Sequence, residues 1–226
     1  MSRFAPRLFA LACMIAVGAA SCSNDTAPSA NPEPSILNLH PGPPSRWFLV
    51  GGAIPTYVVG VDNNTVHGGQ AALAIAGTDT SRLRFNGVTQ NIRADNYRGK
   101  RVRLRAWVRQ VGVVGSDVGI WMRIDGPGVT QGFDNFSSRP LLGTSDWHQV
   151  EVILDIPDNA IGIAFGALMS ASGEFFVDDM TFEVIPANGP TTNQLAGFIA
   201  AGDSASIASA YAASPTAPAN LNFETR

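Results

Sequence analysis

Two tryptophans lie in strand-like segments that also carry arginine residues, and this combination of side chains is suited to binding a sugar. In both segments every second residue is apolar, so the residues between them are expected on the outward face of a sheet. The outward residues that we predict to bind a ligand are Trp107, Trp121, Arg103, Arg105 and Arg123. An exposed indole gives the C–H face of a sugar a flat surface, and arginine donates hydrogen bonds to hydroxyl groups. If the two segments are neighbouring strands, these residues form one glycan-binding surface.

Two other interpretations of this surface stay open. In the first, the indole rings stack on guanidinium groups and simply cover the sheet, or a loop at 131–140 lies over them. In the second, the surface attracts an anionic partner such as a phospholipid headgroup or an acidic polysaccharide. Nine of the 15 Lys and Arg residues lie between Arg82 and Arg109, whereas 13 acidic and 3 basic residues follow Gln110. Such asymmetry is also typical of solvated faces that pair with each other in the fold.

The side chains that commonly act in catalysis are not arranged for it. The three histidines are His40, His67 and His148, and no Gly-x-Ser-x-Gly nucleophile accompanies them. Asp178 and Asp179 are adjacent in a predicted strand and point to opposite faces, which does not suit an acid and a base acting across one bond. The chain also lacks His/Cys spacing for zinc and a phosphate-binding loop. We therefore expect a protein that binds without catalysing a reaction.

The first 21 residues have the features of a bacterial lipoprotein signal peptide. Two arginines precede the apolar run 8–20, which is shorter than the roughly 20 residues of a membrane-spanning helix. Small residues then precede Cys22, as in a lipobox, where the cysteine is acylated and becomes the new N-terminus. Residues 22–34 are predicted to be a tether. Ser23 indicates sorting to the outer membrane, and plain secretion is the alternative.

The export signal limits the chemistry and the partners of the remaining chain. The two cysteines are Cys13 and Cys22, so no disulfide and no cysteine-based metal site is expected in the domain that follows. Nucleic acid is not expected as a partner, because the chain is exported, has a formal net charge of −3 and contains no nucleic-acid-binding motif.

Short apolar segments separated by Gly, Pro, Asn and Asp predict that residues 35–186 form an antiparallel jelly-roll β-sandwich of the all-β class. Separate strands are predicted at 102–108 and 119–124. Three more are predicted between Asp146 and Ile185, with breaks at Pro157 and between Met169 and Phe175.

The chain after the predicted sandwich changes in composition. Residues 187–219 are rich in Ala, Ser, Thr, Gly and Pro and predict a flexible tail with some helix near 193–213. Residues 220–226 predict a short strand. We expect this strand to fold back and complete the edge of the sandwich, and the alternative is the start of a truncated second module.

The order of motifs between residues 36 and 185 resembles the galactose-binding-like jelly-roll family, the fold of many bacterial carbohydrate-binding modules. The motifs are Trp47 with Gly51-Gly52, Tyr57, Asp62, His67-Gly68-Gly69, Gln90-Asn91-Ile92, Tyr97-Arg98-Gly99-Lys100, Asp146-Trp147 and Phe176-Val177-Asp178-Asp179. More specifically, the chain resembles uncharacterised bacterial domains of this type on secreted or regulatory proteins. Because jelly-roll modules have many functions, the resemblance implies the fold more directly than a ligand.

The resemblance also implies a structural metal site. Related modules often hold calcium between a glutamate of an Asn-x-x-Phe-Glu strand, carbonyl groups of the glycine turn and an aspartate pair, and oxygen ligands suit this ion. In this chain the corresponding acids are Asp178, Asp179 and Glu224. The alternative is that these acids lie on a solvated strand edge. No other cofactor is expected.

Together these patterns predict a non-catalytic binding module, carbohydrate-binding-like and anchored to the membrane of the bacterial cell envelope by a lipid. A glycan or an envelope polysaccharide is the expected partner. The alternative is a structural or protein-interaction domain of the envelope that has no small-molecule ligand.

Overall fold

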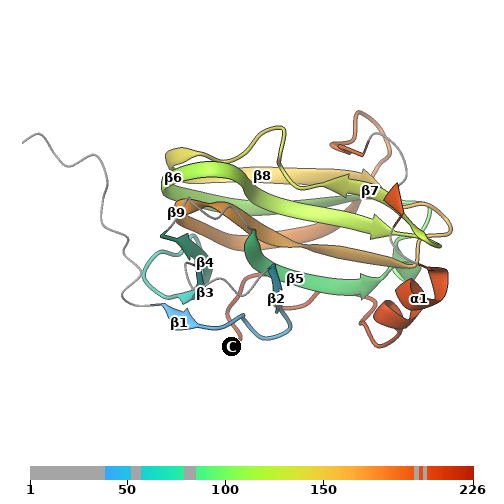
Figure 1. The fold of residues 1–226 in the computed structure, drawn as a ribbon, viewed down its shortest axis with the longest axis horizontal. Coiled ribbons are helices and arrows are strands. Elements are labelled where there is room, and N and C mark those ends of the chain that lie inside the picture. The colour runs from blue at the N-terminus through green and yellow to red at the C-terminus, as the bar shows by residue number, and fades with distance from the viewer. Residues whose placement is uncertain (1–38, 52–56, 79–84, 196–198, 201–202) are drawn as a thin grey trace, which may run out of the picture. The chain divides into compact units, whose positions relative to one another are not determined.

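A computed structural model describes residues 39–51, 57–78, 85–195, 199–200 and 203–226. The predicted signal peptide, the tether and Cys22 lie outside the described residues. The elements are β1 His40–Pro41, β2 Phe48–Gly51, β3 Tyr57–Asp62, β4 Ala72–Gly77, β5 Asn86–Arg93, the 3₁₀ helix η2 Ala94–Asn96, β6 Arg101–Asp125, β7 Val129–Asp134, β8 Gly143–Asp155, β9 Gly162–Ile185, β10 Ile199–Ala200 and α1 Ser204–Ala212. Strands dominate the described chain, which confirms the all-β class (Figure 1). None of its helices is long and apolar enough to cross a bilayer.

Two long strands, β6 and β9, organise the sandwich. They pair antiparallel along almost their whole length, with Arg101 opposite Ile185 at one end. Asp125 lies opposite Gly162 at the other end. The first half of β6 and the second half of β9 belong to a first layer with the order β1-β3-β4-β9-β6-β8. The remaining halves belong to a second layer with the order β2-β5-β9-β6-β7-β10. The continuous sheet thus curls into an antiparallel jelly-roll β-sandwich (Figure 1).

The length of these strands corrects two predictions. The segments 102–108 and 119–124 are not neighbouring strands but the two halves of β6. Likewise, the break predicted between Met169 and Phe175 lies inside β9. The pairing of β6 with β9 shifts register near these glycine-containing stretches, so the ribbon bends by β-bulges instead of turning back. Glycine occurs both at such bends within a strand and at turns between strands, so the sequence alone does not distinguish the two.

The core lies between the two layers, and alternation within each half of β6 supplies part of it. The inward residues of its first half are Val102, Leu104, Ala106 and Val108. Those of its second half are Val118, Ile120, Met122 and Ile124. All eight are fully buried and belong to one hydrophobic cluster. This result confirms the predicted inward face and places the residues between them on two outer surfaces, one for each layer.

A short segment after β9 ties together edge strands of the two layers. Thr192 exchanges hydrogen bonds with Ile153 of β8, including a backbone N–O distance of 2.9 Å. The next two residues bind β7: the amide of Phe133 donates to the Asn193 side chain at 3.0 Å, and the Gln194 amide donates to the Phe133 carbonyl at 2.8 Å. Strand β10 also pairs with β7. The polar groups of these edges are therefore partly satisfied within the chain.

The helix predicted near 193–213 is shorter and lies at the end of that range. The side chain of Asp203 caps α1 by accepting hydrogen bonds from the amides of Ala205 and Ser206 at 3.0 and 2.9 Å. Ile207 and Tyr211 are four residues apart, so they lie on one face of the helix, and both are buried. Packing of this face stabilises a helix of nine residues, which is too short to be stable in isolation even with four alanines.

Residues 220–226 fold back onto the sandwich as predicted, but not as a strand. Asn220 and Phe223 have φ values of 50° and 60°, which lie outside the β region. Phe223 is fully buried, and its ring centroid lies 5.3 Å from that of Trp47. The indole N–H of Trp47 donates to the carbonyl of Asn220 at 2.9 Å. The segment therefore completes the core with one aromatic side chain.

We expect Phe223→Ala to lower the free energy of unfolding by about 3–5 kcal/mol, because it removes a fully buried ring and leaves a cavity. Urea denaturation measures this difference. Asn222→Ala is the matched control, since this neighbouring side chain is exposed and should cost almost nothing. A Phe223→Ala protein as stable as the wild type would contradict a core that includes the C-terminal segment.

Candidate functional site

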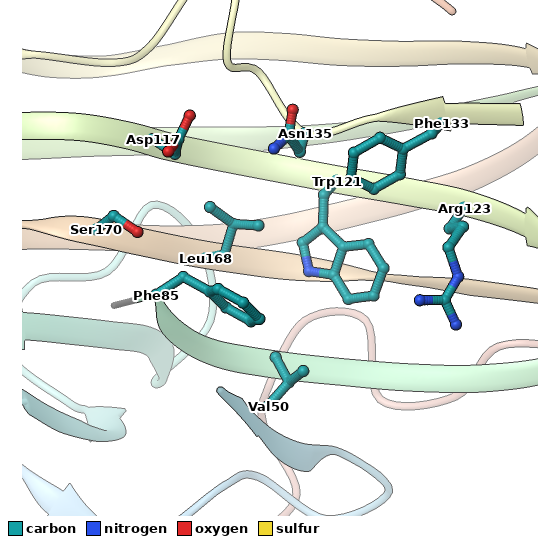
Figure 2. A pocket seen from close by; sticks show the side chains of 9 residues that line it. All are labelled: Val50, Phe85, Asp117, Trp121, Arg123, Phe133, Asn135, Leu168 and Ser170. Carbon is teal, nitrogen blue, oxygen red and sulfur yellow. The ribbon is translucent and has the colours of Figure 1, made fainter. Parts of the chain in front are cut away.

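A pocket of about 180 Å³ opens on the outer surface of the second layer (Figure 2). Its apolar lining comes from Val50, Phe85, Trp121, Phe133 and Leu168. Its polar lining comes from Asp117, Arg123, Asn135 and Ser170. In Figure 2 the carboxylate, amide and hydroxyl groups lie near one end of the pocket and the guanidinium lies at the other. An apolar pocket with a few convergent polar groups is typical of a small-molecule site.

The indole of Trp121 lies in the middle of this pocket. Only 6% of the residue is exposed, and it packs with Ala164 and Leu168, so the exposed indole that the sequence predicted is wrong for Trp121. Its Nε1 is buried and has no hydrogen-bond partner among the described residues. Figure 2 shows this nitrogen on the side of the indole that faces Phe85 and Leu168. A buried N–H without an acceptor costs about 1–3 kcal/mol, so a ligand oxygen at this point would relieve a real penalty.

Glycine in the neighbouring strand makes room for the indole. Gly166 of β9 lies directly opposite Trp121. A Cβ at Gly166 would collide with the carbonyl oxygen of Val88, so this position excludes any side chain. The other outward residue beside it, Ala164, is also small. The ring can therefore lie across β9 instead of standing away from the sheet.

Arg123 is held at the pocket edge by a buried carboxylate. Its Nε lies 3.0 and 3.1 Å from the two oxygens of Asp125, and its Nη2 lies 2.9 Å from Oδ2. Asp125 also accepts hydrogen bonds from the Tyr211 hydroxyl at 2.7 Å and from Thr130 at 3.3 Å. Burial, together with the Asp125 carboxylate, raises the pKa of the Tyr211 phenol, so this phenol stays protonated and donates.

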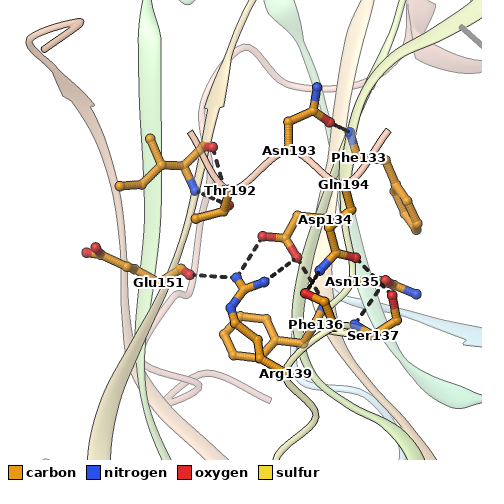
Figure 3. A network of polar contacts seen from close by, with 12 residues as sticks. Phe133, Asp134, Asn135, Phe136, Ser137, Arg139, Glu151, Thr192, Asn193 and Gln194 are labelled. Carbon is orange, nitrogen blue, oxygen red and sulfur yellow. Dashed lines mark hydrogen bonds and ion pairs between the residues drawn. The ribbon is translucent and has the colours of Figure 1, made fainter. Parts of the chain in front are cut away.

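The loop that supplies Asn135 is fixed by an ion pair inside the protein (Figure 3). The side chain of Asp134 is fully buried, and its oxygens lie 3.1 and 2.7 Å from the two terminal nitrogens of Arg139. Arg139 also donates to the carbonyl of Glu151 at 3.2 Å, and its guanidinium lies 3.8 Å from the ring centroid of Phe136. These contacts set the course of the chain directly after β7, where Asn135 enters the pocket.

The structure separates the residues that were predicted to form one binding surface. Trp121 and Arg123 line the pocket of the second layer. Trp107, Arg103 and Arg105 lie on the outer surface of the first layer, because β6 passes from one layer to the other between the two tryptophans. The prediction of one shared surface is therefore wrong. It assumed neighbouring strands, whereas the two segments follow each other in one strand.

The surface around Trp107 is an aromatic cluster. The imidazole of His67 stacks on Trp107 with ring centroids 4.0 Å apart and an angle of 14°. Trp147 contacts the same imidazole edge-on at 5.7 Å. For Trp121, the first part of the predicted covering loop 131–140 belongs to strand β7, and Phe133 of this strand packs against the cluster of Trp121.

The arginines of the first layer are paired with acids of neighbouring strands. Arg103 lies 2.7 Å from Glu183, and Arg105 lies 3.1 Å from Glu151. Arg101 likewise pairs with Asp155 at 2.7 Å. This pattern agrees with the interpretation of solvated faces that complement each other, and it weakens the alternative of an anion-binding patch.

The acids proposed as calcium ligands meet at one turn. Asp178 accepts hydrogen bonds from the amides of His67 and Gly68 at 2.9 and 3.1 Å, and Asp179 lies 2.7 Å from Nδ1 of His67. Glu224 accepts from the amide of Gln70 at 2.7 Å. In the described part of the chain no group of three or more His, Cys, Asp or Glu side chains is arranged to hold a metal ion. These carboxylates act here as hydrogen-bond acceptors for the turn, and calcium binding stays a prediction.

Several pocket residues were missed by sequence reasoning. Asp117 has the same alternation as Trp121 and Arg123, so the outward face of β6 could have been extended to it. Phe133 alternates with buried residues in β7 in the same way. Phe85 and Ser170 carry no such signal, because only the pairing of β5 and β9 with the other strands brings them to the pocket.

Comparison with known proteins gives one clear relative in sequence. No family model matches the chain. An uncharacterised HTH-type transcriptional regulator of Bacillus subtilis strain 168, YbfP, is 35% identical over 150 residues, which are 65% of this chain and 50% of that protein. The chain thus spans about half the length of this curated relative.

Solved structures resemble the general architecture of this chain, with low TM-scores. The CBM22-1 xylan-binding domain of Paenibacillus barcinonensis Xyn10C matches 62% of this chain and 86% of its own, with 14% identity and a TM-score of 0.43. A Stig cyclase of Fischerella sp. TAU matches 67% and 90%, with 10% identity and a TM-score of 0.48. These TM-scores are below 0.5, so no functional conclusion rests on them.

We expect Arg139→Met to lower the free energy of unfolding by about 3–5 kcal/mol, because it leaves the buried charge of Asp134 without its partner. Chemical denaturation of the purified protein measures the loss. Arg103→Met is the control, since its pair with Glu183 is partly exposed and should contribute about 0–1 kcal/mol. An equal decrease in the free energy of unfolding of both variants would show that the pair of Asp134 with Arg139 does not stabilise the loop.

Proposed function

We propose that this chain is a non-catalytic binding module whose Trp121 pocket takes one residue of a carbohydrate. The observation that carries the proposal is the buried Nε1 of Trp121, which has no acceptor among the described residues and lies in a pocket with aromatic walls. A sugar ring presents C–H groups that pack on aromatic rings and hydroxyl oxygens that accept such a hydrogen bond. Its other hydroxyl groups can bind Asp117 and Asn135 at the polar end of the pocket.

The size of the pocket supports a single small ring. Its volume of about 180 Å³ lies below the roughly 300–1,000 Å³ of sites for drug-sized ligands. One sugar residue would therefore occupy the pocket, and the rest of a glycan would lie along the outer surface of the second layer.

The pocket lining supports binding without hydrolysis. Glycosidases of both common types place two carboxyl groups on either side of the scissile bond. Asp117 is the single carboxylate among the described residues that line this pocket. The nearby carboxylate of Asp125 is buried and bonded to Arg123 and Tyr211, so it is not available to a substrate.

The curated relative fits a ligand-binding module that occurs in different proteins. A helix-turn-helix needs two helices, and the described part of this chain contains one α-helix, of nine residues. We infer that the part shared with the regulator binds a ligand, and that DNA binding belongs to the rest of the regulator.

A second candidate function is a protein-interaction domain of the cell envelope without a small ligand. The observation in its favour is the exposure of Phe48 and Leu49 on β2, at 63% and 61%. Strand β2 pairs with β5 on one side, and large exposed apolar side chains on such a strand are typical of a contact with another protein.

The test of the carbohydrate proposal is a glycan array followed by calorimetric titration of the sugars that bind. We expect Trp121→Ala to abolish binding, and Trp121→Phe, which keeps an aromatic ring but removes the N–H, to weaken it about tenfold. Trp107→Ala is the matched control and should bind as the wild type does, because it lies on the other layer. Binding to no sugar would favour the protein-interaction function. Loss of binding in Trp107→Ala but not in the Trp121 variants would move the site to the first layer.

We further propose that a lipid on Cys22 anchors the chain to the membrane, with residues 22–34 as the tether; the lipobox-like sequence supports this proposal. Cys22→Ser should move the protein from the membrane fraction to the soluble fraction when the cells are fractionated. Cys13→Ser, which lies inside the predicted signal peptide, is the control and should leave the distribution unchanged. Unchanged membrane partitioning of Cys22→Ser would contradict the anchor.

A further inference from the structure

We propose that Tyr211 of helix α1 is a positioning residue for the pocket: it acts through Asp125 to hold the guanidinium of Arg123 in its binding orientation. This inference rests in part on the proposed function, because it assigns Arg123 to ligand recognition at the same pocket. The first step is the geometry of three side chains. The Tyr211 hydroxyl and Arg123 Nη2 both bind Oδ2 of Asp125, at 2.7 and 2.9 Å.

The carboxylate between them has little freedom. The side chain of Asp125 is 4% exposed, whereas that of Arg123 is 44% exposed. Thr130 occupies the other carboxylate oxygen at 3.3 Å. A buried carboxylate with donors on both oxygens keeps one orientation, and the partly exposed guanidinium takes its orientation from it.

Tyr211 reaches this carboxylate because the opposite position in β9 has no side chain. Gly162 is the cross-strand partner of Asp125. A Cβ at Gly162 would collide with the ring of Tyr211, so the ring fills the space that the glycine leaves. The chain after α1 is fixed as well: the amide of Arg93 donates to the carbonyl of Pro215 at 2.8 Å. Figure 1 shows α1 beside the end of β5 in the second layer.

The oriented guanidinium retains donors for a ligand. Arg123 uses Nε and Nη2 to bind Asp125, so its Nη1 takes no part in that pair. Arginine carries five N–H donors in a fixed plane, so fixing one edge on Asp125 also fixes the directions of the rest. Helix α1 thereby determines the directions in which Arg123 donates hydrogen bonds at the pocket.

The first experiment needs no sugar. Phenylglyoxal modifies accessible arginines, and peptide mass spectrometry gives the rate at Arg123. We expect Tyr211→Phe to raise this rate at least threefold, whereas the rate at Arg93, whose partly exposed side chain pairs with Asp95, stays constant. Tyr97→Phe is the matched control, because it removes a phenol hydroxyl that has no partner in the described part of the chain. Phe223→Ala, which destabilises the core without touching Arg123, should also leave the rate at Arg123 unchanged. An unchanged rate at Arg123 in Tyr211→Phe would overturn the proposal.

The second experiment uses a sugar retained on the glycan array. We expect Tyr211→Phe to weaken its affinity about three- to tenfold in the wild-type background and to have no effect in the Arg123→Gln background. Equal losses in both backgrounds would show that Tyr211 acts on stability alone and would overturn the proposal. If no sugar binds, the proposed function fails, while the modification rate at Arg123 still decides whether Tyr211 holds the guanidinium.

Discussion

The pairing of β6 with β9 is the constraint on which the rest of this structure depends. Strands of 25 and 24 residues run side by side through both layers, so one ladder of hydrogen bonds joins the two halves of the sandwich. Every other described strand is connected to one half of this ribbon, either directly or through one or two intervening strands. Because side chains alternate along a strand, the same ribbon sends one set of residues into a common core and the other set to two opposite surfaces.

This constraint explains what sequence reasoning found and what it missed. Alternation gave the inward residues correctly within 102–108 and within 118–124, because a face that is buried consists of apolar residue types. The placement of Trp107 beside Trp121 failed, because a bend at a bulge and a turn between strands use the same glycines. Of the residues that line the pocket, Trp121 and Arg123 were among the predicted binding residues, but Phe85 and Ser170 were not, since cross-strand pairing brings them to the pocket. The local residue pattern thus predicts which side chains of a strand face inward and which face outward. Which residues of other strands lie beside them depends on the register of strand pairing.

The C-terminal part of the chain contributes more than its composition suggests. Three consecutive residues, Thr192 to Gln194, join edges of both layers, and α1 delivers a phenol to a carboxylate beside the pocket. Low apolar content predicted a tail, but a few well-placed side chains suffice to dock such a segment. Phe223 and Tyr211 are separate examples, one in the core and one at the site.

The contact between Trp47 and the last turn of the chain also bears on how the domain folds. The hydrogen bond from the indole of Trp47 to the carbonyl of Asn220 joins residues 173 positions apart in sequence. Contacts of such separation close a large loop late in folding and slow it, because the loop entropy is lost before the contact forms. A chain that is still being synthesised therefore holds an unfinished core with an unoccupied aromatic site. The exposed rings of that intermediate would be at risk of aggregation until Phe223 arrives.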